Sequence, residues 1–406
     1  MLVILVTPSL SPDCLAVLRG LVAIAGARVG LVCHAAADGI PSPLREQLVG
    51  HYKVDSVGDE GAVLQALLAF QASFGRIHRL LGFAEVLQVQ LARLRDRLGI
   101  EGLTEAVALN FRDKHRMKEA LARAGLPVAR QQLVQAPSAA WAFAEAVGWP
   151  VVLKPLAGVG SQGTMRADGP RQLEDALTKL RPSPERPVLA EAFLRGPERT
   201  FETVLVDGQP VWCSQTLYLD RPLDILETPW KQWTVLFPRE VMDDEARRFL
   251  ATDVAALRAL GLRTGMAHLE WFLTPDGPVI GEVGARPPGA RFMTMLGYSY
   301  DADLWARWAE LEVLGVWRPL PERQHAVGCA FFRGQGHGSR IVAVEGLDRA
   351  QRAVGSLVMD VQLPQIGAAA RPSYEGDGWA VVRHPDTEVV RDALRTLISS
   401  VRVRLG

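Results

Sequence analysis

The stretch that decides the fold is HLEWFLTPDGPVIGEVGAR, residues 268–286. Two apolar runs flank the turn-forming segment TPDGP, which is the pattern of a β-hairpin. Pro275 and Pro278 disfavour a tight two-residue turn, because proline cannot donate to the strand ladder. A loop of three or five residues pairs Glu270 directly with Glu282. Directly opposed residues share a sheet face, with Cβ atoms about 5 Å apart.

Two carboxylates at that separation repel each other, so the pair predicts a bound cation. Oxygen ligands of this kind suit Mg²⁺. Strand alternation places Gly284 and Arg286 on the same face as Glu282. A divalent cation beside a guanidinium would neutralise charge on a transferred group, so the hairpin indicates phosphoryl transfer. The alternative is an exposed hairpin with scattered charges.

A glycine-rich loop lies upstream, in VVLKPLAGVGSQGTMRADG (151–169). Gly158, Gly160 and Gly163 form a GxGxxG string, but TMRA follows where a dinucleotide-binding fold needs a helix. We therefore predict a flap between two strands, with Ser161 at its tip, whose backbone N–H groups close over phosphates. The alternative is a flexible hairpin.

Two lysines accompany this loop. Lys154 lies on the strand that enters the loop. Lys114 follows the expected N-cap Asp113, in the first turn of a helix over 114–125. The helix dipole disfavours a cation at that position, so a bound phosphate would explain Lys114. The alternative is a solvated lysine.

A candidate hinge follows in PVLAEAFLRGPERTFE (187–202). A nucleotide base stacked against Phe193 and Leu194 would fit this segment, with Glu198 on the ribose hydroxyls. Glu191 precedes them on the incoming strand. The alternative is that both glutamates are ordinary surface residues.

The composition excludes several classes of protein. The 406 residues carry 45 Lys+Arg and 45 Asp+Glu, so the chain as a whole lacks a basic nucleic-acid footprint. The four cysteines are scattered without a CxxC pair, which argues against a disulfide framework and a zinc site. The first apolar run ends at Pro8, and no window of about 18 residues is apolar and uncharged. We therefore expect a cytoplasmic protein without membrane contact.

The rest of the chain alternates strand and helix signals. Apolar runs at 2–6 and 29–34 predict buried strands, and the spacing over 60–98 predicts helix. Together they indicate a small open α/β domain over the first ~105 residues. Helices are also expected at 138–147, 170–180, 243–260, 301–315 and 386–400.

Taken together, these motifs resemble the ATP-grasp superfamily of carboxylate–amine ligases, in its amino-acid ligase and biotin carboxylase branches. The resemblance covers 109–320 and rests on DKHRMKEALARAGLPVA, VVLKP, the flap, EAFLRGPE and HLEWF…EVGARPPG in that order. It implies an α/β and α+β fold in three parts. These parts are a pre-ATP-grasp α/β domain (1–108), an ATP-grasp domain (109–320) whose mobile flap subdomain is 130–195, and a C-terminal α+β subdomain (321–406) that completes the active site.

The resemblance also implies roles by position. Arg286 would stabilise an acyl phosphate, and Arg291 in RPPGAR would bind a substrate carboxylate bidentately. The family usually reads E-x-N-x-R, so Gly284 removes one metal ligand. The remaining implied contacts are Lys114, Lys154, Gly158, Gly160, Ser161 and Gly163 on the phosphates of ATP, Glu191, Phe193 and Leu194 on adenine, Glu198 on ribose, and Glu270 and Glu282 on Mg²⁺ or Mn²⁺.

Acceptor recognition is less defined by the sequence. His268 shares the face of Glu270 and is either a site residue or a core histidine. Trp230 and Trp233 line either a substrate pocket or the core, and Arg333 is a further candidate.

The implied reaction activates a carboxylate as an acyl phosphate, releases ADP and joins the acyl group to an amine. The small-molecule carboxylate and amine are the expected partners, with no nucleic acid, and the family implies a homodimer. One alternative is a biotin-carboxylase-like enzyme that activates bicarbonate, although the chain has no biotinyl-lysine motif. The other is a nucleotide-binding module without turnover.

Overall fold

The N-terminal part of the chain is a parallel four-stranded sheet in the order β3-β2-β1-β4. In the computed structural model, which describes residues 1–158 and 160–406, every residue of β1 is buried. This matches the apolar run at its position, because both faces of a parallel sheet are covered. The elements are β1 (Leu2–Thr7), α1 (Pro12–Val22), β2 (Arg28–Cys33), α2 (Ser42–Arg45), β3 (Leu48–Lys53), α3 (Glu60–Phe74), β4 (Ile77–Leu81) and α4 (Gln88–Leu98).

The helical prediction over 60–98 is wrong in the middle. The chain leaves α3 at Gly75, whose φ of 84° a side chain would strain. Ile77 and Leu80 then enter the sheet on β4, both fully buried. Gly75 was the available signal for this break, since glycine commonly ends a helix.

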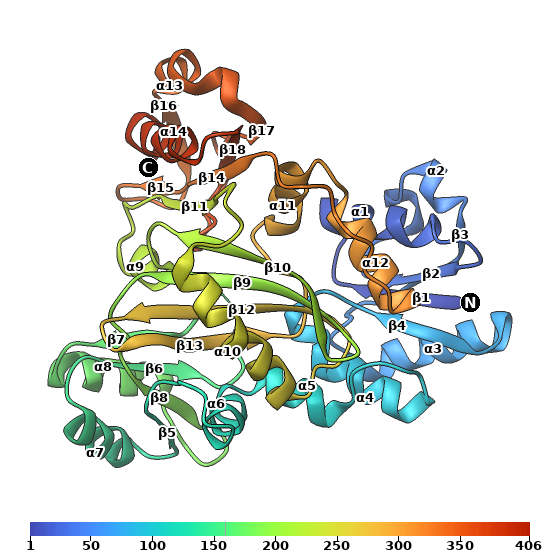
Figure 1. Ribbon diagram of the computed structural model, residues 1–406, viewed down its shortest axis with the longest axis horizontal. Helices are drawn as coiled ribbons and strands as arrows, with labels where there is room; N and C mark the ends of the chain where they lie inside the picture. The colour runs from blue at the N-terminus through green and yellow to red at the C-terminus, as the bar shows by residue number, and fades with distance from the viewer. Residues whose placement is uncertain (159) are drawn as a thin grey trace.

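A second unit carries the flap. Its antiparallel sheet has the order β5-β8-β6-β7 and is covered by two helices (Figure 1). The strands and helices expected here are confirmed within a few residues. The elements are α5 (Glu105–Arg112), α6 (Lys114–Arg123), β5 (Gln131–Val134), α7 (Pro137–Val147), β6 (Val151–Pro155), β7 (Met165–Ala167), α8 (Pro170–Leu180) and β8 (Val188–Ala192).

The centre of the molecule is one eight-stranded sheet in the order β13-β12-β9-β10-β11-β14-β18-β17. Its first five strands are β9 (Glu198–Val206), β10 (Gln209–Tyr218), β11 (Trp233–Phe237), β12 (Gly265–Thr274) and β13 (Gly277–Gly284), and the C-terminal ones are β14 (Ala326–Phe332), β17 (Val358–Gln362) and β18 (Gly378–His384). The sheet therefore runs across residue 321. The three-part division of the chain stays a prediction.

Helices and a small sheet complete this part. Helices α11 and α13 were not expected from the sequence. The remaining elements are α9 (Pro222–Glu227), α10 (Asp244–Leu260), α11 (Phe292–Tyr300), α12 (Leu304–Leu314), α13 (Leu347–Val354), α14 (Thr387–Ser400), and the sheet of β15 (Gly334–Gln335), β19 (Arg402–Leu405) and β16 (Ile341–Glu345). None of the helices in the described residues is long and apolar enough to cross a bilayer.

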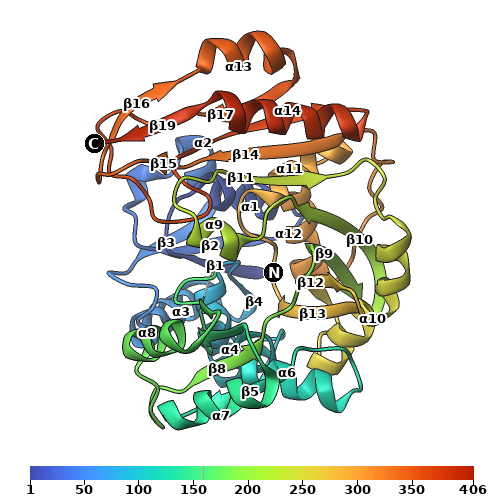
Figure 2. The same ribbon diagram turned by 90° about the vertical axis from the view of Figure 1, so that its left-hand side faces the viewer.

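The N-terminal sheet is held against the central sheet through α1 and α12. Gly20 makes this approach close, because a Cβ there would lie 2.9 Å from the Cα of Ala306. Figures 1 and 2 show the N-terminal unit and the flap unit next to the central sheet. All three parts contribute residues to one pocket, which holds the candidate site.

Candidate active site

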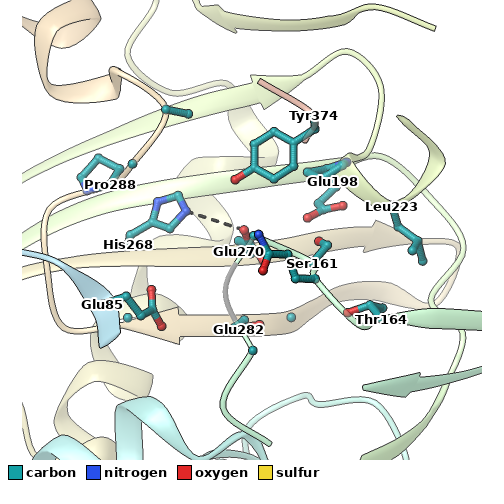
Figure 3. Close-up of a pocket in the computed structure, with 18 of the residues that line it drawn as sticks. Glu85, Ser161, Thr164, Glu198, Leu223, His268, Glu270, Glu282, Pro288 and Tyr374 are labelled. Atoms are coloured by element: carbon teal, nitrogen blue, oxygen red, sulfur yellow. Dashed lines mark ion pairs between the residues drawn. The ribbon is translucent and has the colours of Figure 1, made fainter. Parts of the chain in front are cut away.

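A pocket of roughly 380 Å³ lies between these three parts of the molecule. Most of the residues predicted from sequence meet there (Figure 3). Gly163 and Arg291 are not among the lining residues. The predicted residues that line the pocket are Lys114, Lys154, Gly158, Gly160, Ser161, Glu191, Phe193, Leu194, Glu198, Glu270, Glu282 and Arg286.

The hairpin pairs Glu270 with Glu282, as predicted, but by a different route. The expectation of a longer loop is wrong: Thr274 pairs with Gly277, which leaves a two-residue turn. A β-bulge at Gly281 then shifts the register by one residue. Only glycine fits this bulge, because a Cβ there would lie 2.9 Å from the Phe272 ring and 3.0 Å from a backbone oxygen.

The two carboxylates are each matched by a protein cation. Glu282 Oε1 lies 2.7 Å from Lys114 Nζ. Burial would raise the pKa of Glu282, but Lys114 and Lys154 outweigh it and lower that pKa to about 2. Glu270 Oε1 lies 3.7 Å from Nε2 of His268. Lys114 and His268 thus lie beside the pair in this structure, and the predicted divalent cation stays a prediction.

His268 is a site residue rather than a plain core histidine. Its Nδ1 lies 2.9 Å from Oε1 of the fully buried Glu202, which also accepts hydrogen bonds from the hydroxyls of Thr200 and Thr216. Burial lowers the pKa of His268, but Glu202 and Glu270 together raise it to about 9. The ring also lines the pocket.

A third lysine, which sequence reasoning missed, supports the other two. Lys154 Nζ lies 2.8 Å from Glu191 Oε2, and the buried Lys118 Nζ lies 3.4 Å from the other oxygen. Lys118 also donates to the carbonyl of Ile280 at 3.0 Å. Its position one helical turn after Lys114 was the available signal. The Glu191 side chain thus contacts both Lys118 and Lys154, of which Lys154 lines the pocket.

The carboxylate oxygens in the pocket suit a divalent cation that is also bound by the phosphates of a nucleotide. In residues 1–158 and 160–406, no three His, Cys, Asp or Glu side chains form a metal cage. Glu270 and Glu282 supply carboxylate oxygens on one face, and both line the pocket. Mg²⁺ is commonly held by one or two carboxylates together with phosphates and water. The residues present therefore suit such a cation.

The glycine loop joins β6 to β7, so the prediction of a flap between two strands is confirmed. Arg112 and Lys114 donate to the carbonyl of Gly158 at 2.9 and 3.2 Å and hold the base of the flap. Gly160 and Ser161 both have left-handed backbone, with φ of 59° and 57°. Ser161 is thus a non-glycine residue with a positive φ, and both residues line the pocket.

The candidate hinge differs from the prediction in one respect. The guanidinium groups of Arg166 and Arg221 lie 4.4 and 4.7 Å from the centre of the Phe193 ring. The two guanidinium groups lie over the Phe193 ring, and this disfavours the predicted stacking of a nucleotide base on it. Glu198 is buried and lines the pocket, and burial together with Glu270 raises its pKa well above the usual value.

Arg286 is held by a residue from the N-terminal unit. Its Nε donates to Oε2 of Glu85 at 2.5 Å, and Nη1 donates to the carbonyl of Pro287 at 2.8 Å. Arg112 lies 3.6 Å from the other oxygen of Glu85. No local sequence signal marks Glu85, because it acts 201 residues away from its partner.

Three other candidates lie elsewhere. Arg291 Nη2 donates to Asp360 at 2.5 Å and lies over the Trp379 ring, so its guanidinium is already paired. Arg333 is a structural residue that donates to backbone carbonyls. Trp230 is 68% exposed and does not line the pocket, whereas the buried Trp233 does.

Comparison with known proteins agrees with this geometry. Residues 113–285 match the family described as carbamoyl-phosphate synthase L chain, ATP binding domain. Residues 113–285 are therefore an ATP-grasp domain, and the match covers less than half of the chain.

The similar proteins include amino-acid ligases and a biotin carboxylase domain. An L-arginine-specific L-amino acid ligase of Bacillus subtilis is 25% identical over 273 residues, which are 65% of this chain and 64% of that protein. The solved L-amino acid ligase from Bacillus licheniformis has a TM-score of 0.77 at 18% identity, covering 100% of this chain and 98% of that one. The biotin carboxylase domain dimer of Hydrogenobacter thermophilus 2-oxoglutarate carboxylase, solved with MgADP, ADP and bicarbonate, has a TM-score of 0.67 at 17% identity and covers 99% and 90%. This chain spans 54% to 64% of the length of the first curated relatives it matches.

Proposed function

We propose that this protein is an ATP-dependent ligase that activates a carboxylate as an acyl phosphate and joins it to an amine, forming ADP and phosphate. The observation that carries the proposal is the Glu270–Glu282 pair on one face of the hairpin, in a pocket that also holds Lys114 and Lys154. Opposed carboxylates beside phosphate-binding lysines are the arrangement that phosphoryl transfer requires.

Each part of the pocket has a proposed task. Lys154, Lys114 and the flap N–H groups would bind the phosphates, and Glu198 would accept from the ribose hydroxyls. Arg286, fixed by Glu85, would donate to the transferred group and stabilise its developing charge. Positioning and charge neutralisation then account for catalysis, without a side-chain nucleophile.

Glu270 and Glu282 would hold Mg²⁺, or Mn²⁺ in its place. A bound divalent cation supplies Lewis-acid stabilisation of phosphate charge. Lys114 now lies beside Glu282 and is within reach of the flap, so it would be free to donate to a phosphate once Glu282 has another cation.

The substrates that we propose are amino acids or short peptides. The similarity to L-amino acid ligases in sequence and in fold supports this class. A bicarbonate-activating reaction is the alternative, since the fold is shared with a biotin carboxylase domain. We further propose a cytoplasmic homodimer, because ATP is available there and one structural neighbour is a dimer.

Phosphate release from Mg·ATP tests the proposal. We expect phosphate and ADP only when a particular pair of amino acids or amines is present, with stoichiometric ligation product by mass spectrometry. Release with bicarbonate alone would favour the alternative enzyme. Formation of AMP and pyrophosphate would contradict the acyl-phosphate route, and tight ATP binding without turnover on the whole panel would indicate a nucleotide-binding module.

Substitution of Gly284 by asparagine should strengthen metal binding. A Cβ at this position would lie 3.6–3.9 Å from the nearest atoms, all of the Arg286 side chain, so the larger residue fits. Its amide oxygen would add a ligand next to Glu282. We expect half-maximal Mg²⁺-dependent ATP binding at an Mg²⁺ concentration about threefold to tenfold lower, measured by calorimetry, since such ligand changes alter affinity by about this order. An unchanged or higher Mg²⁺ requirement would contradict the placement of the metal on this face.

A further inference from the structure

A loop from the C-terminal part of the chain forms one wall of the pocket. Between β17 and β18, residues 371–377 reach the pocket with Tyr374 and Glu375. The Tyr374 ring makes a T-shaped contact with Trp233, with 4.6 Å between the ring centres. Figure 3 shows Tyr374 across from Ser161 at the tip of the flap.

The loop is held in this place by several bonds. Arg333 donates through Nε to the carbonyl of Ser373 at 3.0 Å, and through Nη1 to the carbonyls of Ile225 and Lys231 at 2.7 Å each. Gly376 has a φ of 60°, and a Cβ there would lie 2.4 Å from a backbone oxygen. The position of Tyr374 is therefore determined before any ligand binds.

Tyr374 meets the flap at a glycine. A Cβ on Gly160 would lie 3.4 Å from Cε1 and 3.5 Å from the hydroxyl oxygen of Tyr374. The ring thus lies against the backbone of Gly160, at a left-handed residue that lines the pocket. The base of the flap is held separately, by Arg112 and Lys114.

We propose that Tyr374 is a positioning residue, whose ring holds the tip of the flap at Gly160 in the geometry that binds the phosphates. The role in nucleotide binding rests on the proposed function, whereas the contact with the flap does not. Two readouts therefore separate the two proposals.

The first readout is hydrogen exchange of the protein without nucleotide. In Tyr374→Ala we expect the amide of Thr164, which donates to the carbonyl of Ser161 at 3.0 Å, to exchange at least about threefold faster, because local opening depends on the contacts that remain. Tyr374→Phe keeps the ring and should match the wild type. Tyr52→Ala, which removes an exposed ring from β3, is the control for loss of a tyrosine. Unchanged exchange at the flap in Tyr374→Ala would overturn the proposal.

The second readout is the KM for ATP compared with kcat. Tyr374→Ala should raise the KM for ATP by about tenfold and reduce kcat at saturating ATP less, although the loss of packing on Trp233 lowers the unfolding temperature. A merely structural role would lower stability and leave the ratio of the two constants unchanged. That result would count against the proposal.

A double-mutant cycle isolates the contact. Gly160→Ala adds a methyl group against the ring and strains the left-handed backbone, and the strain is the same in both backgrounds. We expect Gly160→Ala to raise the KM for ATP by a smaller factor in the Tyr374→Ala background than in the wild type. Equal factors would show that the two residues act independently and would overturn the proposal. If the wild type binds no ATP, the proposed function fails, while the exchange experiment still decides whether Tyr374 holds the flap.

Discussion

Glu282→Gln should reduce ATP-dependent phosphate release by at least about 10³-fold, because it removes the negative charge that would hold the divalent cation. The amide is the same size, so the bulged hairpin should keep its register. Without its partner at 2.7 Å, Lys114 becomes free for a phosphate. ATP binding measured without Mg²⁺ should therefore persist or strengthen, whereas the gain in affinity on adding Mg²⁺ should disappear.

The matched control is Asp276→Asn in the turn of the same hairpin. Asp276 is exposed and does not line the pocket, so this substitution should leave turnover unchanged. Glu270→Gln, on the opposite strand, should give a loss similar to that of Glu282→Gln. Retention of turnover within about tenfold of wild type in Glu282→Gln would contradict the assignment of this face to the metal.

Arg286→Lys is expected to lower kcat by about 10²–10³-fold, while the KM for ATP changes only a few-fold. Lysine keeps the positive charge but lacks the planar set of five donors. In this structure the guanidinium donates to Glu85 and to the carbonyl of Pro287 at once. A single ammonium group cannot make these bonds and also donate to a transferred phosphoryl group in the pocket.

Glu85→Gln tests how much the orientation of the Arg286 guanidinium contributes, apart from its charge. It leaves the guanidinium in place but weakens the contact that holds it, so we expect a loss of kcat smaller than that of Arg286→Lys. Steady-state kinetics of both variants, with unfolding temperatures as a check on folding, would measure this order. A wild-type kcat in Arg286→Lys would show that Arg286 does not act on the transferred group.

The residues that could be predicted from sequence are those whose partners lie nearby in the chain. Glu270 faces Glu282 across one hairpin, and the period of two in a strand is enough to place them on one face. The pairing was reached through an incorrect loop length, because the bulge at Gly281 compensates for the shorter turn. The flap and its two strands were likewise readable from local glycine spacing.

The residues that were missed come from distant segments with ordinary local sequence. Glu85 follows β4, a strand hidden inside an apparently helical spacing, and meets Arg286 only through the tertiary fold. Tyr374 reaches Gly160 from the far end of the chain. Arg291 stays a prediction: its closeness to Arg286 in sequence suggested a role in the site, yet in this structure it pairs with Asp360 and does not line the pocket.

The continuous central sheet limits how this protein can be cut or recombined. Strands β14, β18 and β17 form three of its eight strands and follow residue 321, and β11 pairs directly with β14. Truncation before residue 326 would leave β11 as a bare edge with Trp233 uncovered, a surface that promotes aggregation. The C-terminal segment is therefore an integral part of the central sheet, and chimaeras with proteins of the same fold should exchange it together with β9–β13.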